Sequence, residues 1–127
     1  MITLKNIDLT YLANSLANLS GVPVRIYKNN KQIYFSSIIP LIKDPAQLVK
    51  DDLLTKTNDI GYVTTPDFFY YGYVRYKSKL LVIGPTRLIA PDNSTLNNLA
   101  FELGIEKDFL DEFINAMKSI ISMPLES

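Results

Sequence analysis

The stretch that decides the fold lies at residues 60–83 and reads IGYVTTPDFFYYGYVRYKSKLLVI. β-Branched and aromatic residues dominate it, which predicts strands at 60–64, 68–76 and 79–83. The links between them are Thr65-Pro66-Asp67, which suits a type I turn, and Lys77-Ser78. Because links this short join antiparallel neighbours, the three strands form one continuous meander.

Upstream of the meander, the pattern predicts a helix, a hairpin and a second helix. Asp8 can cap a first helix of about 12 residues that ends near Gly21, with an apolar stripe made of Leu9, Leu12, Ala13, Leu16 and Leu19. Strands at 22–27 and 32–36 flank Asn29-Asn30, a pair that tolerates the positive φ of a tight turn. A second helix is predicted over 45–56, with Asp44 as its cap and Pro45 at its first position.

Downstream, two helices are predicted at about 94–103, ending at Gly104, and at about 107–122. The complete order is helix, two strands, helix, three strands, two helices. This order predicts an α+β fold, a PAS/GAF-like five-stranded antiparallel sheet with helices packed on it. In such a fold the last strand lies between the first and the fourth, and the middle helix closes a pocket over one face. The whole chain, 1–127, is expected to be a single domain.

The composition excludes most catalytic chemistry. The 127 residues contain 13 Lys and Arg, 13 Asp and Glu, and no histidine, cysteine or tryptophan. Serine–histidine and cysteine–histidine catalysis, zinc fingers and thiol redox chemistry are therefore impossible. No constellation of carboxylates supports catalysis either, so we expect no enzyme activity, no metal site and no cofactor. No signal peptide or membrane span is recognisable, which predicts a cytoplasmic domain without a membrane partner.

Charge is distributed unevenly along the chain. Residues 1–90 carry 11 basic and six acidic side chains, whereas residues 91–127 carry two lysines and seven acidic side chains. The two C-terminal helices have the spacing of a helix-turn-helix unit, but their net charge over 94–118 is −3. A recognition helix that begins with acidic residues would be repelled by phosphate, so packing or dimerisation explains these helices better.

The tyrosine-rich strand carries the candidate binding residues. Alternation places Phe69, Tyr71, Tyr73 and Arg75 on one face, a row suited to stacking a flat ligand and pairing an anionic group. Arg25 and Tyr27 alternate together on the first strand, and Tyr34 lies on its neighbour. In the alternative interpretation the tyrosines only pack under helices and the arginines are solvated. Gly72, in the middle of the strand, suggests close approach by a backbone, a ligand or a ring.

Two segments carry a resemblance to a known family. They are Leu81-Val82-Ile83-Gly84-Pro85, followed by two helices, and the closing stretch Ile120-Ile121-Ser122-Met123-Pro124-Leu125-Glu126. With the tyrosine-rich strand, the chain resembles the N-terminal PAS/GAF-like sensor region of AraC-type transcriptional regulators of Gram-positive bacteria, the group associated with YSIRK-type surface antigens. The resemblance implies that a basic helix-turn-helix pair follows Ser127 in the intact protein and that DNA is bound only there.

Two functional hypotheses follow. In the first, the chain senses a small-molecule effector and forms a homodimer, and effector binding shifts the helix packing that positions the DNA-binding region. In the second, the chain is a ligand-free protein–protein interaction module of the same fold.

Overall fold

The computed structural model of the chain describes residues 8–65, 69–87 and 92–121. Its helices are α1 (Leu9–Ser20), α2 (Lys50–Thr55), α3 (Asn93–Leu103) and α4 (Leu110–Ile121), with 3₁₀ turns η2 (Pro45–Leu48) and η3 (Lys107–Phe109). The strands are β1 (Val24–Lys28), β2 (Lys31–Ser36), β3 (Ile60–Thr64), β4 (Tyr70–Tyr76) and β5 (Lys79–Thr86). They form one antiparallel sheet in the order β2-β1-β5-β4-β3. The α+β class and the insertion of the last strand between the first and the fourth are confirmed.

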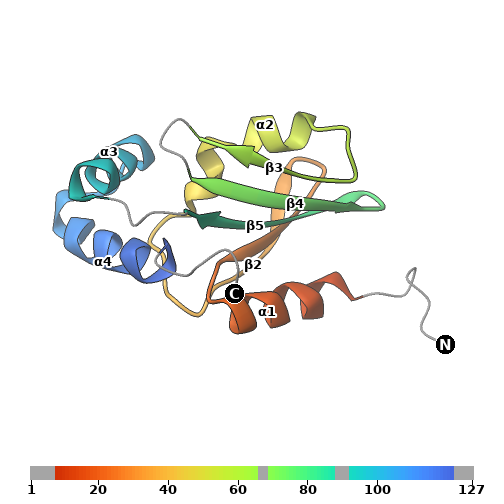
Figure 1. Cartoon of the computed structure of the whole chain (residues 1–127), viewed down its shortest axis with the longest axis horizontal. Coiled ribbons are helices and arrows are strands. Elements are labelled where there is room, and N and C mark those ends of the chain that lie inside the picture. The colour runs from red at the N-terminus through yellow and green to blue at the C-terminus, as the bar shows by residue number, and fades with distance from the viewer. Residues whose placement is uncertain (1–7, 66–68, 88–91, 122–127) are drawn as a thin grey trace.

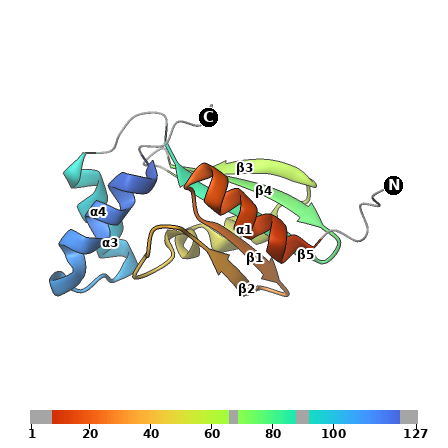
Figure 2. The same ribbon diagram turned by 90° about the horizontal axis from the view of Figure 1, so that it is seen from below.

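Helices cover both faces of this sheet (Figure 1). Helix α1 crosses one face over β1, β2 and β5, as Figure 2 shows most clearly. The turn η2 and helix α2 lie on the opposite face, and α3 and α4 pack together at one end of the sheet (Figure 1). Two hydrophobic clusters result, one under α1 and a larger one between the sheet, η2, α2 and the C-terminal helix pair.

Helix α1 begins and ends where the sequence predicted. The Asp8 carboxylate accepts hydrogen bonds from the backbone N–H groups of Thr10 and Tyr11, and Gly21 adopts the left-handed conformation after the last turn. The buried stripe is narrower than predicted, however. Its residues are Leu9, Ala13 and Ala17, whereas Leu19 is 86% exposed. Small alanines face the sheet because they let the helix axis approach the strands closely.

The hairpin between β1 and β2 has the predicted turn. Both Asn29 and Asn30 have positive φ, as a two-residue turn that matches the twist of its strands requires. The predicted turn residues Pro66 and Asp67 lie outside the described residues.

The predicted second helix over 45–56 is wrong in one respect, because it is broken in two. Residues Pro45–Leu48 form the 3₁₀ turn η2, and Val49, with φ of −116°, separates it from α2. Asp44 caps η2 through the N–H of Ala46 and is also bound to Arg25 of β1. This tertiary attachment, which no local pattern reveals, fixes where the segment starts on the sheet.

The C-terminal helices keep their predicted places. Asp92 caps α3 by accepting from the Thr95 N–H, Gly104 ends it with positive φ, and a short 3₁₀ turn precedes α4. In α4, Phe113 and Met117 are fully buried against α3 and the sheet. Within the described residues, every helix is too short or too polar to cross a bilayer.

Candidate ligand-binding cavity

A cavity of about 200 Å³ lies between the sheet, η2 and α3. The sheet contributes Phe69 and Tyr71, and Thr65 borders the cavity at the end of β3. The remaining walls come from the η2 segment and from α3: Pro45, Leu48, Val49, Leu99 and Glu102. Apolar side chains therefore dominate the lining, and Glu102 is its charged residue.

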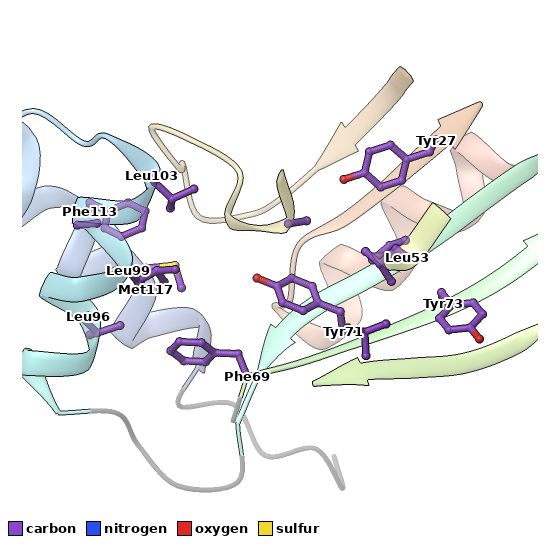
Figure 3. Close-up of a cluster of buried hydrophobic side chains, with 14 of the residues drawn as sticks. Tyr27, Leu53, Phe69, Tyr71, Tyr73, Leu96, Leu99, Leu103, Phe113 and Met117 are labelled. Carbon is purple, nitrogen blue, oxygen red and sulfur yellow. The ribbon is translucent and has the colours of Figure 1, made fainter. Parts of the chain in front are cut away.

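Phe69 and Tyr71 reach the cavity because they are two residues apart in extended chain and so point to the same face. The Thr65 N–H donates to the Phe69 carbonyl, and the Phe69 N–H donates to the Thr65 hydroxyl, so the two sides of the β3–β4 connection are held together. Both aromatic rings point toward α3 and α4 (Figure 3). Burial raises the pKa of the Tyr71 hydroxyl, which stays protonated and available as a hydrogen-bond donor.

The η2 wall is fastened to the sheet by a buried ion pair. The Arg25 Nε donates to Asp44 Oδ2 at 3.0 Å and its Nη2 donates to Asp44 Oδ1 at 2.8 Å. The Arg25 Nη1 donates to the Gly84 carbonyl at 2.8 Å. The guanidinium is fully buried and stands 5.5 Å and 6.0 Å from the ring centres of Phe35 and Tyr71. We refer to the Arg25–Asp44 pair below as the clasp.

The same loop is also tied to α3. The Lys43 ammonium donates to the Leu103 carbonyl at 3.1 Å, where the last turn of α3 leaves its carbonyl groups free. Lys43 and Asp44 are adjacent, so one short segment connects the wall of the cavity to both the sheet and the C-terminal helices.

Of the predicted site residues, only Phe69 and Tyr71 line the cavity. Tyr27 and Tyr73 belong to the same hydrophobic cluster but lie farther along the sheet (Figure 3). Burial, with a contribution from the Asp44 carboxylate, raises the pKa of Tyr27 to about 12. The Tyr73 ring covers Gly61, where a β-carbon would come within 2.6 Å of its hydroxyl oxygen. These two tyrosines pack the core, as the alternative interpretation stated.

The two predicted arginines, Arg25 and Arg75, have partners within the chain. Arg25 forms the clasp, and the half-buried Arg75 donates from Nη2 to the Lys56 carbonyl at 2.6 Å. Arg87 stacks over Phe69 at 5.5 Å, and its Nη1 is buried without a hydrogen-bond partner among the described residues.

Tyr34 lies on the other face of the sheet, against the α1 cluster, and is separated from the cavity by the sheet itself. The close approach expected at Gly72 is absent, since a β-carbon added to Gly72 would meet its nearest atom, on Ile83, at 3.4 Å. The expected close approach occurs instead at Gly84, which has φ of +150° and where a β-carbon would lie 2.8 Å from the Tyr70 carbonyl oxygen and from the Tyr71 ring.

Sequence reasoning missed the cavity residues contributed by the helices. Leu48, Leu99 and Glu102 carry no motif, and only the packing of η2 and α3 against β4 brings them together. A second, wider hollow of about 470 Å³ lies between α3 and α4 and has a mainly polar lining: Asn93, Asn97, Leu110, Asp111, Ile114, Asn115 and Lys118. The described residues hold no cluster of carboxylates able to bind a metal ion.

Comparison with known proteins adds no relative. No family model, no curated protein and no solved structure matches this chain.

Proposed function

We propose that this chain is the ligand-sensing and dimerising domain of an AraC-type bacterial transcription regulator that acts in the cytoplasm. DNA would be bound by a helix-turn-helix region outside these 127 residues. The observation that carries the proposal is the partly open cavity bordered by the sheet, η2 and α3. The strand order β2-β1-β5-β4-β3 and the resemblance at residues 81–85 and 120–126 support the same assignment.

The cavity sets the size and chemistry of the effector. A volume of about 200 Å³ exceeds the roughly 150 Å³ of an engineered apolar cavity that binds benzene, so a single ring with a short substituent fits. Phe69 and Tyr71, each 1% exposed, border the floor of the cavity, and the exposed Glu102 carboxylate at its rim favours a cationic substituent there. We therefore propose a small aromatic amine as the class of effector, bound without chemical conversion.

The response to the effector would pass through α3. Leu99 and Glu102 contact the cavity from α3, and α3 packs against α4 through the buried side chains of Leu96, Phe113 and Met117. A ligand that binds more tightly to one position of α3 shifts the population of that position, and the helix pair moves with it. This is the coupling that a regulator needs between its sensor and its DNA-binding region.

Phenethylamine tests the proposal, with phenylacetate as a probe of equal size and opposite charge. The expected result is a rise in melting temperature with increasing phenethylamine, since a ligand that binds only the folded state stabilises it by mass action. Phenylacetate should give a smaller rise.

Two variants locate the binding site. Leu99→Trp should fill the cavity and abolish the shift, whereas Leu19→Trp, a matched change at an 86% exposed position, should leave it unchanged. If neither probe shifts the melting temperature or perturbs the NMR signals of Phe69, Tyr71 and Leu99, the aromatic-amine proposal fails.

One observation favours the second candidate function, a ligand-free interaction module. Among the described residues, no helix covers the β3–β4 half of the sheet face on which α1 lies, and Ile60, Tyr62 and Val74 there are 71%, 68% and 44% exposed. An apolar face of this kind is typical of protein contacts.

A further inference from the structure

Strand β3 forms one margin of the sheet. Its strand neighbour is β4, and no described element lies beyond it in the plane of the sheet (Figure 2). Its sequence, Ile60-Gly61-Tyr62-Val63-Thr64, contains no charged residue and no proline. An edge strand with these features is a template for pairing with another strand.

The hydrogen bonds at the two ends of β3 show which of its backbone groups are free. The Thr65 N–H donates to the Phe69 carbonyl at 2.9 Å, and the Asp59 carbonyl accepts from the Arg75 N–H at 2.6 Å. The β3–β4 register is continuous between these points, so odd-numbered residues direct their N–H and C=O groups at β4. Those of Ile60, Tyr62 and Thr64 therefore point outward.

The opposite margin of the sheet, β2, is protected against pairing. Its register with β1 shifts at Ile33, which leaves that residue in a bulge, and it begins with Lys31. Its last residue, Ser36, donates through its hydroxyl to Asn14 of α1. Bulges, lysines and a covering helix are the devices by which natural sheets block edge pairing. A bulge and a lysine are found at β2, whereas β3 carries neither.

We propose that β3 pairs with β3 of a second copy of this chain, antiparallel and about a two-fold axis at Tyr62, to give a continuous ten-stranded sheet. A two-fold rotation at Tyr62 brings the outward-pointing N–H and C=O groups of Ile60, Tyr62 and Thr64 opposite the same groups of the second copy. Tyr62 would exchange both backbone hydrogen bonds with Tyr62 of the second copy, and Ile60 would do so with Thr64 of the second copy. The inference supplies the dimer surface of the proposed function, but it requires no ligand.

Side chains and charges fit a second copy in particular. The two Tyr62 rings would lie directly opposite on the uncovered face, beside Ile60, and would bury aromatic and apolar surface that is exposed in one chain. Asp59, the nearest charged residue on the N-terminal side, would lie opposite Thr65 of the second copy, so this pairing sets no like charges face to face. A peptide of a different protein would have no such enforced symmetry.

Sedimentation velocity tests the association. Between about 5 and 500 μM the wild-type mass should rise from the 14.4 kDa of one chain toward twice that value. Tyr62→Lys should weaken the association about tenfold or more, because two lysines would then face each other across the axis. Ile33→Lys, a matched change at the half-exposed position on β2, should leave it unchanged.

Amide hydrogen exchange tests the pairing itself on the wild-type chain, so the proposal stays decidable even if Tyr62→Lys fails to fold. The N–H groups of Ile60, Tyr62 and Thr64 should become slower to exchange as concentration rises, and those of β2 should not. A chain that stays monomeric at 500 μM overturns the proposal. So does a dimer that is weakened by Ile33→Lys, and so does a dimer in which the β3 amides exchange at the same rate at all concentrations. A β3 dimer whose melting temperature does not respond to phenethylamine would refute the aromatic-amine effector and leave this inference intact.

Discussion

Replacing Asp44 by asparagine tests whether the clasp holds η2 on the sheet. Asparagine keeps an oxygen that can accept from the Ala46 N–H but removes the charge that faces the fully buried Arg25 guanidinium. Removing one partner of a buried ion pair costs about 3–5 kcal/mol, and the 14% exposure of Asp44 places the expected loss near the lower end, about 3 kcal/mol. Domains of this kind have a total stability of about 5–15 kcal/mol, so the loss is a large part of it.

The assay is urea unfolding followed by far-UV circular dichroism, because the chain contains no tryptophan. Asp44→Ala, which also removes the cap of η2, should lose about 1 kcal/mol more than Asp44→Asn. The double variant Arg25→Met/Asp44→Asn no longer contains an uncompensated buried charge. Its loss of unfolding free energy should therefore be about 2 kcal/mol smaller than the sum of the losses of the two single variants.

The control is Asp52→Asn, at a pair that the clasp resembles in charge but not in burial. Asp52 and Lys56 are 3.6 Å apart on the surface of α2, with side chains 55% and 39% exposed, so the expected change is about 0.5 kcal/mol or less. A loss below about 1 kcal/mol for Asp44→Asn, or strict additivity in the double variant, would refute the reasoning.

Three further predictions concern the core. Because the folded-state pKa of Tyr27 is about 12 and that of an unfolded tyrosine about 10, unfolding releases a proton between these values. The contribution of Tyr27 to stability, complete below pH 10, should therefore fall by about 2–3 kcal/mol toward pH 12. Urea unfolding at pH 9 and pH 11.5 should show a smaller fall for Tyr27→Phe than for wild type, and no such difference for Tyr11→Phe at an exposed position. Gly84→Ala should lower the free energy of unfolding by about 2–4 kcal/mol, because its β-carbon would meet the Tyr70 carbonyl and the Tyr71 ring at 2.8 Å. Gly72→Ala, whose β-carbon meets nothing closer than 3.4 Å, should change it by no more than about 1 kcal/mol. Equal losses for the two variants would contradict the close approach of the backbone at Gly84. Phe113→Ala should lower the free energy of unfolding by about 3–5 kcal/mol, and Phe101→Ala, at an 86% exposed position of α3, should not change it measurably.

Local signals in the sequence determined the elements of this protein. Asp8 and Gly21 marked the two ends of α1, Asn29-Asn30 gave the tight turn, and β-branched and aromatic runs gave the strands. These features are encoded within a few residues because capping, positive φ and strand alternation depend on near neighbours. The order of the elements predicted the α+β class, and its likeness to PAS- and GAF-like folds predicted the place of β5.

Tertiary structure alone decided the roles of the polar and aromatic side chains. Arg25 has the pattern of a ligand-binding arginine, but Asp44, 19 residues later, binds it. The predicted helix that follows Asp44 is broken at Val49. Of the tyrosine-rich strand, only Phe69 and Tyr71 reach the cavity, because η2 and α3 cover one end of the sheet face, and Leu99 and Glu102 join them without any motif. Alternation in a strand fixes the face to which a side chain points, whereas the partner it meets there depends on segments far away in the sequence.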